Sequence, residues 1–237
     1  MHMQTRRERV HQAAIDEIKA IAWETANTDG VDHITVNGIA REMGMTPPAF
    51  YSYFKSREEL LRSLVIDAYH SFQDALIKAR DALPESDGAR RIYHVYIAYR
   101  EWSIQNPSMF GLFAGRRVHG FRHGEPEIIS EAEKGYKIFI KLFETAWQQG
   151  IISVVPLDTP LPESYRAGIE LNRRRWNLEL PIEVYHKAIN IALISHGMIS
   201  MELSGRFYNQ AADMDAFYQY QVLDFMKKLG ICYSPDS

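Results

Sequence analysis

The chain has 237 residues, of which 46% are hydrophobic and 24% charged, an ordinary globular composition with enough length for a core of its own. The formal net charge of −3 gives no bulk indication of a nucleic-acid partner. Because no run of about 18 apolar residues, no secretory signal pattern and no cysteine besides Cys232 occurs, we expect a cytoplasmic protein without a transmembrane helix or a disulfide framework.

The first predicted helix runs from Arg6 to Thr28. Its apolar residues recur with the helical period and define the face that we expect to be buried: Val10, Ala14, Ile18, Ile21 and Thr25. Gly30 follows at a place where glycine can end a helix in the left-handed conformation.

The next stretch, residues 34–60, predicts two short helices around a glycine turn. The apolar face of the first of them is formed by Val36, Ile39, Ala40 and Met43. Thr35 stands at the N-cap, where its hydroxyl can accept a hydrogen bond from a free amide of the first turn. Gly44 supplies the left-handed residue that ends this helix.

The second short helix is predicted from Pro47 to Phe54, with Thr46 as its N-cap and proline at its first position. Ser56 and Glu59 have the spacing of a capping box that opens a longer helix. Two short helices, a glycine turn and a long third helix indicate a helix-turn-helix, whose second helix reads the major groove of DNA.

The longer helix is expected from Arg57 to about Arg80, and residues 84–88 form a linker after it. From Ala89 onward no strand alternation of any length occurs, so the predicted fold is all-α. Further helices are predicted over residues 89–105, 108–117, 126–150 and 163–176.

The last two predicted helices cover residues 182–207 and 213–229. The first of them has almost no polar face, and a helix that is apolar all round is buried on all sides. We therefore expect a homodimer in which two helices of each subunit form a four-helix interface. The residues assigned to this interface are Ile191, Ile194, Met198, Met201, Phe217, Val222 and Phe225.

The helix-turn-helix stretch resembles the DNA-binding domain of the TetR family of bacterial repressors. The residues that carry the resemblance are Gly44, Thr46, Tyr51, Tyr53, Phe54, Lys55 and Arg57. The stretch departs from the family pattern at Pro47-Pro48-Ala49, where two prolines remove amides that could face phosphate. In the second half, residues 100–121 and 192–207 resemble one TetR subgroup; His196, Gly197 and Glu202 match it, and Ala192 stands where the subgroup has Trp.

The resemblance implies a DNA-binding domain over residues 1–56 and a ligand-binding and dimerisation domain over residues 57–237. It also implies a double-stranded operator as partner, contacted by Thr35, Thr46, Pro47, Pro48, Ala49, Tyr51, Ser52, Tyr53, Lys55 and Arg57. Ala49 and Ser52 would lie nearest the base edges, and the threonines would bond phosphate at helix N-termini. We assign Phe54 to the core, whereas Tyr51 either contacts DNA or packs in the core.

A ligand pocket is the second site that the resemblance implies. Its candidate lining is aromatic and consists of Tyr96, Tyr99, Trp102, Phe110, Phe113, Phe143 and Trp147. Aromatic residues at helical spacing equally form a core, and only the resemblance favours a pocket. The expected ligand is a small apolar or aromatic inducer that releases a repressor from a palindromic operator.

No catalytic pattern, cofactor motif or metal-ligand set stands out, so we expect neither an enzyme nor a cofactor. His119 and His123 have a spacing that could bind metal on a helix, but the glycines beside them favour a loop, and no further ligand completes a zinc set. His196 is expected to be a packed histidine. Two alternatives remain. One is a TetR-like activator or a repressor without inducer, and the other is an all-α carrier or enzyme for a hydrophobic ligand that does not bind specific DNA.

Overall fold

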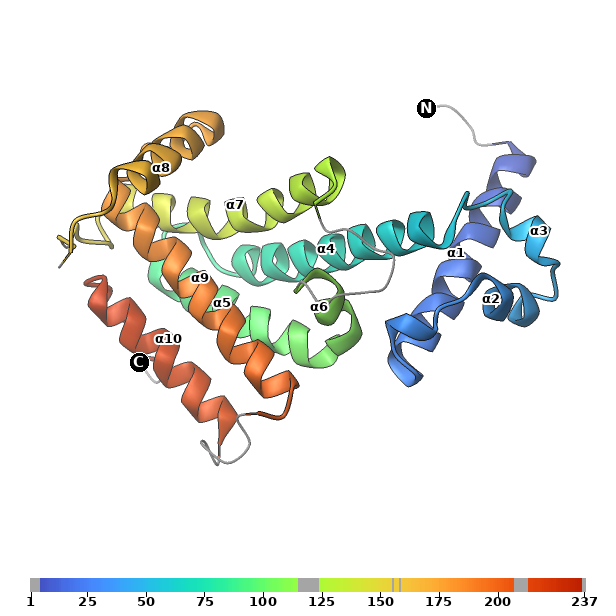
Figure 1. The fold of residues 1–237 in the computed structure, drawn as a ribbon. Coiled ribbons are helices and arrows are strands. Elements are labelled where there is room, and N and C mark those ends of the chain that lie inside the picture. Colours follow the sequence, from blue (N-terminus) through green and yellow to red (C-terminus); the bar gives the residue numbers. More distant parts are fainter. Residues whose placement is uncertain (1–4, 115–123, 155, 158, 207–212, 236–237) are drawn as a thin grey trace. The chain divides into compact units, whose positions relative to one another are not determined.

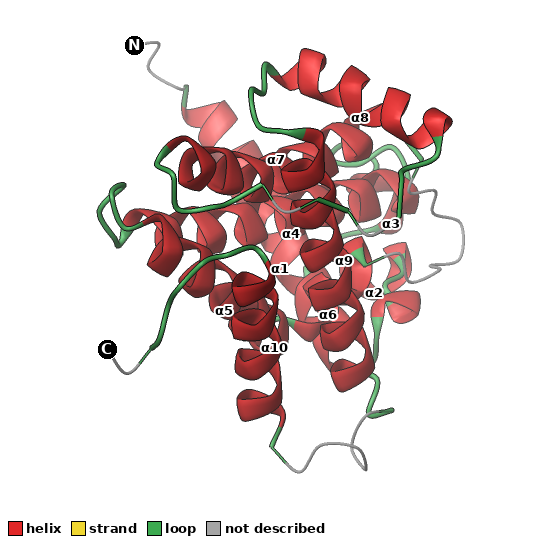
Figure 2. Cartoon of the chain, turned by 90° about the vertical axis from the view of Figure 1, so that its left-hand side faces the viewer, coloured by secondary structure: helices red, strands yellow, loops and turns green. Residues whose placement is uncertain are grey.

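The structure is a computed structural model that describes residues 5–114, 124–154, 156–157, 159–206 and 213–235. These residues form ten α-helices and one short 3-10 helix, and no strand occurs among them (Figures 1 and 2). The predicted all-α fold is therefore confirmed. None of the described helices combines the length and hydropathy that a membrane span requires.

In chain order the helices are α1 (Arg6–Thr28), the 3-10 helix η1 (Val31–His33), α2 (Val36–Glu42), α3 (Pro47–Phe50), α4 (Arg57–Asp81), α5 (Gly88–Gln105), α6 (Pro107–Phe113), α7 (Pro126–Gln148), α8 (Glu163–Trp176), α9 (Ile182–Leu203) and α10 (Met214–Lys228). The chain divides into two compact units. The first unit comprises residues 1–70 and 106–131, and the second comprises residues 71–105 and 132–237. Both α4 and α7 contribute residues to each unit.

The core of the first unit lies between α1, the helix-turn-helix and α4. It contains Ile18, Ala22, Ile34, Ile39, Phe50, Phe54, Leu60, Leu61, Leu64 and Val65. Burial confirms the assignment of Phe54 to the core. The expectation for Val10 is wrong, since its side chain is 63% exposed. The buried stripe of α1 starts only near Ile18, because the first turns of this helix extend past the core.

The end of the second short helix differs from the prediction, since the α-helical pattern stops at Phe50 rather than at Phe54. The chain continues in tighter turns, in which the amides of Ser52 and Tyr53 donate to the carbonyl oxygens of Ala49 and Phe50 at 3.1 and 2.9 Å. The Ser52 hydroxyl also donates to the Ala49 carbonyl at 2.7 Å. Such local hydroxyl bonds compete with continuation of an α-helix.

The second unit packs α5, α7, α8, α9 and α10 around an apolar core. Helix α9 contacts α5, α8 and α10, and α10 also contacts α5. The core includes Ile92, Tyr96, Tyr99, Phe139, Phe143, Ala188, Ile199, Tyr218 and Val222. Helix α9 ends at Leu203, before the predicted residue 207, and Gly205 follows with a φ of 69°.

Gly88 is buried at the start of α5, where an added side chain would displace the ends of two neighbouring side chains. A Cβ atom there would lie 2.8 Å from the Ile151 Cδ1 and 2.8 Å from the Gln149 Oε1. We expect Gly88→Ala to lower the free energy of unfolding by about 1 kcal/mol, the lower end of the cost of overpacking, because both contacted atoms are the ends of side chains that can move aside. The measurement is urea unfolding followed by circular dichroism.

Gly168 in α8 provides the matched control for this prediction, because among the described residues no atom outside its own helix backbone and chain neighbours lies within 4 Å of a Cβ placed there. Gly168→Ala should raise stability by about 0.5–1 kcal/mol, the gain in helix propensity. A Gly88→Ala protein as stable as the wild type would show that the packing around Gly88 relaxes freely.

Candidate DNA-binding and ligand-binding sites

The turn between α2 and α3 is fixed by a cap at one end and a glycine at the other. The Thr35 hydroxyl accepts a hydrogen bond from the Gly38 amide at 3.1 Å, so the predicted N-cap of α2 is confirmed. Gly44 has a φ of 63°, the predicted left-handed conformation, which costs glycine little. The Met45 amide then donates to the Ala40 carbonyl at 2.9 Å and closes the end of α2.

Helix α3 projects its polar and small side chains outward while one aromatic ring anchors it. Phe50 is fully buried, and the exposed residues around it are Thr46, Pro47, Pro48, Ala49, Tyr51 and Ser52. Thr46 is the N-cap residue, but its side chain accepts no capping hydrogen bond. Its hydroxyl and the small Ala49 and Ser52 side chains can therefore approach another surface closely.

The residues that follow α3 lie in two different environments, exposed for Tyr51 and Lys55 and half-buried for Tyr53. Tyr51 is 52% exposed, and Lys55 is exposed as well. Tyr53 is half-buried, and its ring stacks on the His11 ring at 5.0 Å between centroids, with an interplanar angle of 22°. His11 was not found by the sequence analysis, because the two rings lie 42 positions apart (53 − 11) in the chain.

Arg57 contacts the protein backbone. Its Nε donates to the Ile34 carbonyl at 2.5 Å, and its Nη2 donates to the carbonyls of Val31 and Asp32 at 3.3 and 3.4 Å. These bonds hold the segment that leads into α2.

The predicted capping box at the start of α4 differs from the expected pattern by one residue. The Glu59 amide donates to the Ser56 hydroxyl at 3.2 Å, while the Glu59 carboxylate accepts from the Lys55 amide.

A surface groove beside α2 is acidic. It has a volume of about 820 Å³, and its lining includes Glu17, Glu24, Asp29, Glu42 and Thr35. Four carboxylates there repel phosphate, and only Arg41 and His33 in the same lining can offset them. The exposed face of α3 is consequently the better place for a polyanion than the groove.

The aromatic residues predicted to line a ligand pocket fall into two groups. Tyr96, Tyr99, Trp102, Phe143 and Trp147 belong to the second unit, while Phe110 and Phe113 belong to the first. In the second unit Phe72 and Phe139 connect the rings, with centroid distances of 4.9 Å for Phe72–Tyr99 and 5.1 Å for Tyr96–Phe139. In the first unit Phe113 stacks on Tyr69 at 5.1 Å and meets Phe110 edge to face at 5.4 Å.

Polar groups lie within the aromatic cluster of the second unit. The Tyr99 hydroxyl and the His196 Nδ1 are 2.7 Å apart, and burial lowers the pKa of His196. The expected packed histidine is thus confirmed, and the structure adds its hydrogen bond to Tyr99. The Tyr96 hydroxyl is buried and has no hydrogen-bond partner among the described residues, and burial raises its pKa. A bound ligand with a polar group could satisfy such a hydroxyl.

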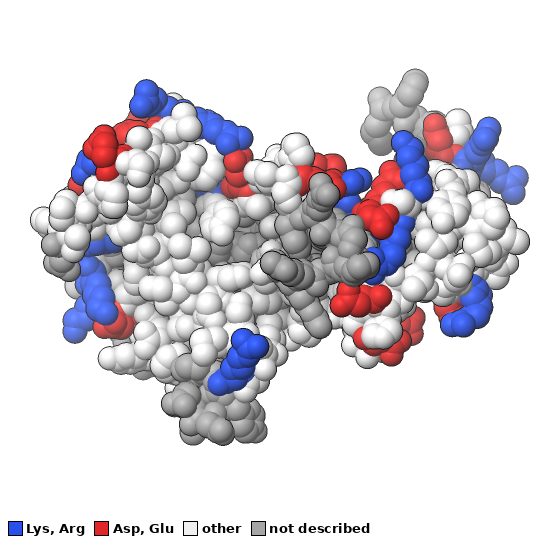
Figure 3. All heavy atoms as spheres, in the orientation of Figure 1, with Lys and Arg blue, Asp and Glu red and all other residues white. Residues whose placement is uncertain are grey.

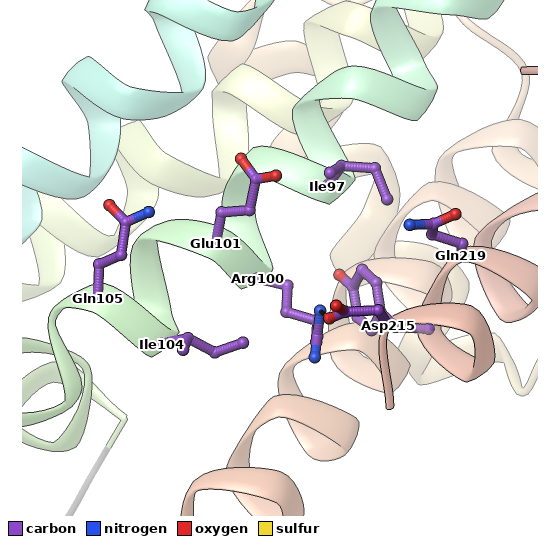
Figure 4. Close-up of a pocket in the computed structure, with 8 residues that line it drawn as sticks. Ile97, Arg100, Glu101, Ile104, Gln105, Asp215 and Gln219 are labelled. Carbon is purple, nitrogen blue, oxygen red and sulfur yellow. Dashed lines mark hydrogen bonds and ion pairs between the residues drawn. The ribbon is translucent and has the colours of Figure 1, made fainter. Parts of the chain in front are cut away.

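A separate pocket of about 220 Å³ lies between α5 and α10 (Figure 4). Its lining consists of Ile97, Arg100, Glu101, Ile104, Gln105, Asp215, Tyr218 and Gln219. The side chains of Arg100 and Asp215 point toward each other across this site, and Arg100 also binds Glu202 with two hydrogen bonds of 2.8 and 2.6 Å. Burial lowers the pKa of Arg100, but the bonds and charges of Glu202 and Asp215 outweigh it, so the pKa is raised overall.

The predicted dimer residues differ in their exposure. Ile194 and Met201 are 51% and 43% exposed, and Met198, Phe217 and Phe225 are half-buried. Ile191 and Val222 are buried inside the chain itself, at 2% and 1% exposure. The sequence analysis did not select two further exposed apolar side chains, Leu193 on α9 and Tyr220 on α10, at 52% and 64%. The two helices lie side by side (Figures 1 and 2).

His119 and His123, the pair weighed as metal ligands, lie outside the described residues. Within the described residues, no group of three or more His, Cys, Asp or Glu side chains is arranged to hold a metal ion.

Two family models match the chain. Residues 18–64 match the model described as "Bacterial regulatory proteins, tetR family", and residues 92–225 match "Tetracyclin repressor-like, C-terminal domain". The HTH-type transcriptional regulator Rv1816 of Mycobacterium tuberculosis is 26% identical over 205 residues, which cover 85% of this chain and 86% of that protein.

Solved structures have the same fold. The crystal structure of the regulatory protein SCO4313 has 27% sequence identity and a TM-score of 0.76, covering 94% of this chain and all of that one. A protein of unknown function from Rhodococcus sp. RHA1 has 18% identity and a TM-score of 0.70, covering 91% of this chain and 95% of that one.

Proposed function

The chain belongs to the TetR family of bacterial transcriptional regulators, with an N-terminal helix-turn-helix DNA-binding domain, and on that premise we propose that it is a ligand-responsive repressor. It would act in the cytoplasm as a homodimer on a palindromic operator, and a small apolar or aromatic inducer would release it. We assign residues 1–56 to the DNA-binding domain and residues 57–237 to ligand binding and dimerisation.

The observation that supports DNA reading best is the exposed face of α3, held by the buried Phe50 and the left-handed Gly44. In a helix-turn-helix the second helix enters the major groove, and a two-fold dimer contacts two half-sites one or more helical turns apart. Ala49 and Ser52 would lie at base edges. Phosphate contacts would come from Thr46, Tyr51, Tyr53 and Lys55, with Pro47 and Pro48 packed against the DNA backbone. Thr35, whose hydroxyl caps α2 in the lining of the acidic groove, would position α2 rather than bind phosphate.

Arg57 is better placed to shape the site than to bind phosphate. Its guanidinium already donates to carbonyls between Val31 and Ile34, and these bonds fix the approach to α2. We therefore propose that Arg57 positions the helix-turn-helix and that Lys55 supplies the cationic contact beside it.

Helix α4 is the proposed mechanical link between ligand and DNA. In the first unit the Lys19 ammonium pairs with the Asp67 carboxylate at 2.9 Å and joins α1 to α4. Arg62 forms a bidentate pair with Glu125, just before α7, with an Nη2–Oε1 distance of 2.9 Å. In the second unit Phe72 of the same helix contacts Tyr99. A ligand with different affinities for two positions of α4 would shift the population of the DNA-binding state.

The test is selection of bound duplexes from a random DNA library at near-physiological salt. We expect one inverted repeat to be enriched. Ala49→Glu places a charge on the exposed face of α3 and should abolish enrichment, because phosphate and base-edge acceptors repel a carboxylate. Ala20→Glu changes an alanine of α1 that is also exposed, and this control should retain enrichment.

The enriched duplex then serves as the probe for the inducer. A panel of hydrophobic and aromatic compounds is screened for release of the duplex and for a rise in melting temperature, which ligand binding to the native state produces. Failure of a folded, dimeric wild-type chain to enrich any sequence would contradict the repressor and favour a carrier of hydrophobic ligands.

A further inference from the structure

The ring of His11, near the N-terminal end of α1, stacks on the ring of Tyr53. Tyr53 follows α3, the helix that we propose enters the major groove. The two rings are 5.0 Å apart and nearly parallel. The His11 side chain is exposed, so the contact lies at the surface of the first unit rather than in its core. The first turns of α1 extend past the core, as the 63% exposure of Val10 shows.

One side of this extension faces the helix-turn-helix. With 3.6 residues per turn, Arg7 and His11 lie within about 60° of the buried Ile18 and Ala22 around the helix axis. The helix face that is buried at Ile18 and Ala22 therefore continues toward the N-terminus as the face that bears Arg7 and His11. Arg7 lies about 6 Å beyond His11 along the axis, one turn past the ring that contacts Tyr53.

The charge of this end is positive. Arg6, Arg7 and Arg9 occupy the first two turns and are exposed, and cationic side chains gather there on the surface (Figure 3). The one acidic residue among them, Glu8, is engaged in the helix cap, since its carboxylate accepts from the Thr5 amide at 2.7 Å. The helix N-terminus adds a partial positive charge of its own.

We propose that the operator surface extends from α3 onto the first two turns of α1, with Arg7 contacting a backbone phosphate and His11 positioning Tyr53. The proposal rests on the proposed function, because it needs a bound operator. Tyr53 is half-buried, and its stack with His11 restricts the orientation of its ring and hydroxyl. Arg7, on the same side of α1, then reaches the phosphate backbone next to that hydroxyl.

Arg9 provides the matched control within the same helix. Like Arg7 it is exposed, but it lies about 200° away around the axis, on the side of α1 opposite to His11. Arg7→Gln and Arg9→Gln remove the same charge from the same helix end. A purely long-range electrostatic attraction would respond equally to both substitutions, whereas a phosphate contact would respond to the first alone.

The experiment measures the dissociation constant of the full chain for its selected operator between 0.05 and about 0.3 M salt, by fluorescence anisotropy. Arg7→Gln should weaken binding about tenfold and reduce the slope of log affinity against log salt by about 0.9, the value for one phosphate contact. Arg9→Gln should match the wild type. Equal effects of the two substitutions would overturn the phosphate contact.

The positioning role has a separate readout. His11→Ala should weaken operator binding roughly three- to tenfold, as the loss of an aromatic pair does, without changing the salt slope. His11→Phe, which can still stack on Tyr53, should restore affinity. In a Tyr53→Phe background, His11→Ala should cause little further loss, because the two residues act through one hydroxyl.

A His11→Phe chain as weak as His11→Ala, or full additivity with Tyr53→Phe, would overturn the positioning role. Melting temperatures of all variants serve as the folding control, since His11 is exposed and Tyr53 is half-buried. If the wild-type chain selects no duplex at all, the DNA-binding function itself fails. If it selects one and Arg7→Gln behaves as Arg9→Gln does, only the extension onto α1 fails.

Discussion

Replacing Glu202 with glutamine is expected to lower the free energy of unfolding by about 3 kcal/mol, the lower end of the cost of breaking a buried ion pair. The substitution keeps the shape of the side chain but removes the less exposed of the two carboxylate charges that neutralise Arg100. The Arg100 side chain is 10% exposed, and both its Nε and its Nη2 donate to Glu202. For a chain of this size the loss corresponds to a fall in melting temperature of roughly 6–12 °C.

Asp215 gives the matched comparison, because it binds the same guanidinium from an exposed position. Its side chain is 74% exposed, and its Oδ1 accepts from the Arg100 Nη1 at 2.5 Å. Asp215→Asn should therefore cost less than about 1 kcal/mol, the usual value of an exposed pair. Equal losses from the two substitutions would show that burial does not distinguish the two carboxylates.

The double substitution Arg100→Leu with Glu202→Leu tests the origin of the effect. If the cost of Glu202→Gln comes from an uncompensated buried charge, the apolar pair should recover most of the lost stability. The three residues join α5, α9 and α10. A loosened network would thus also disturb the helices that carry the proposed dimer surface, so unfolding should be measured at a fixed protein concentration.

The second large effect is expected from Ile194→Asp on the exposed face of α9. Leu193, Ile194 and Met201 on α9 and Tyr220 on α10 form the candidate dimer surface, each at least 43% exposed. Burying an aspartate there without a partner opposes association. Light scattering should show a mass near the 27.4 kDa of one chain instead of twice that value. Operator affinity should fall by about 10²-fold or more, because two linked half-site contacts become one.

Leu171 on α8 is the control for this substitution, since it is apolar and 65% exposed. Leu171→Asp should leave both the mass and the operator affinity unchanged. A dimeric Ile194→Asp protein with unimpaired operator binding would contradict the assignment of this face to the partner subunit. Loss of the dimer in both variants would point to a general solubility effect rather than to an interface.

Local features of the sequence determined the secondary structure. The predicted α8 has the bounds that the structure shows, and α5 begins one residue before the predicted start. The Thr35 cap and the left-handed Gly44 occur where the sequence placed them. Caps, glycine conformations and helical periodicity depend on neighbours within about four residues, so they can be predicted from short segments. The resemblance to the TetR family, carried by the same stretch, gave the fold and the class of function.

The tertiary structure alone decided which side chains meet and which faces remain open. His11 and Tyr53 are 42 positions apart, and Arg100 is 102 positions from Glu202 and 115 from Asp215. In α9 apolar residues occupy every side, so periodicity could not show that Ile191 turns inward while Leu193 and Ile194 turn outward. Arg57 was selected for its charge, but its carbonyl partners depend on how the chain folds back. These contacts form only when distant segments pack, because no local pattern contains both partners.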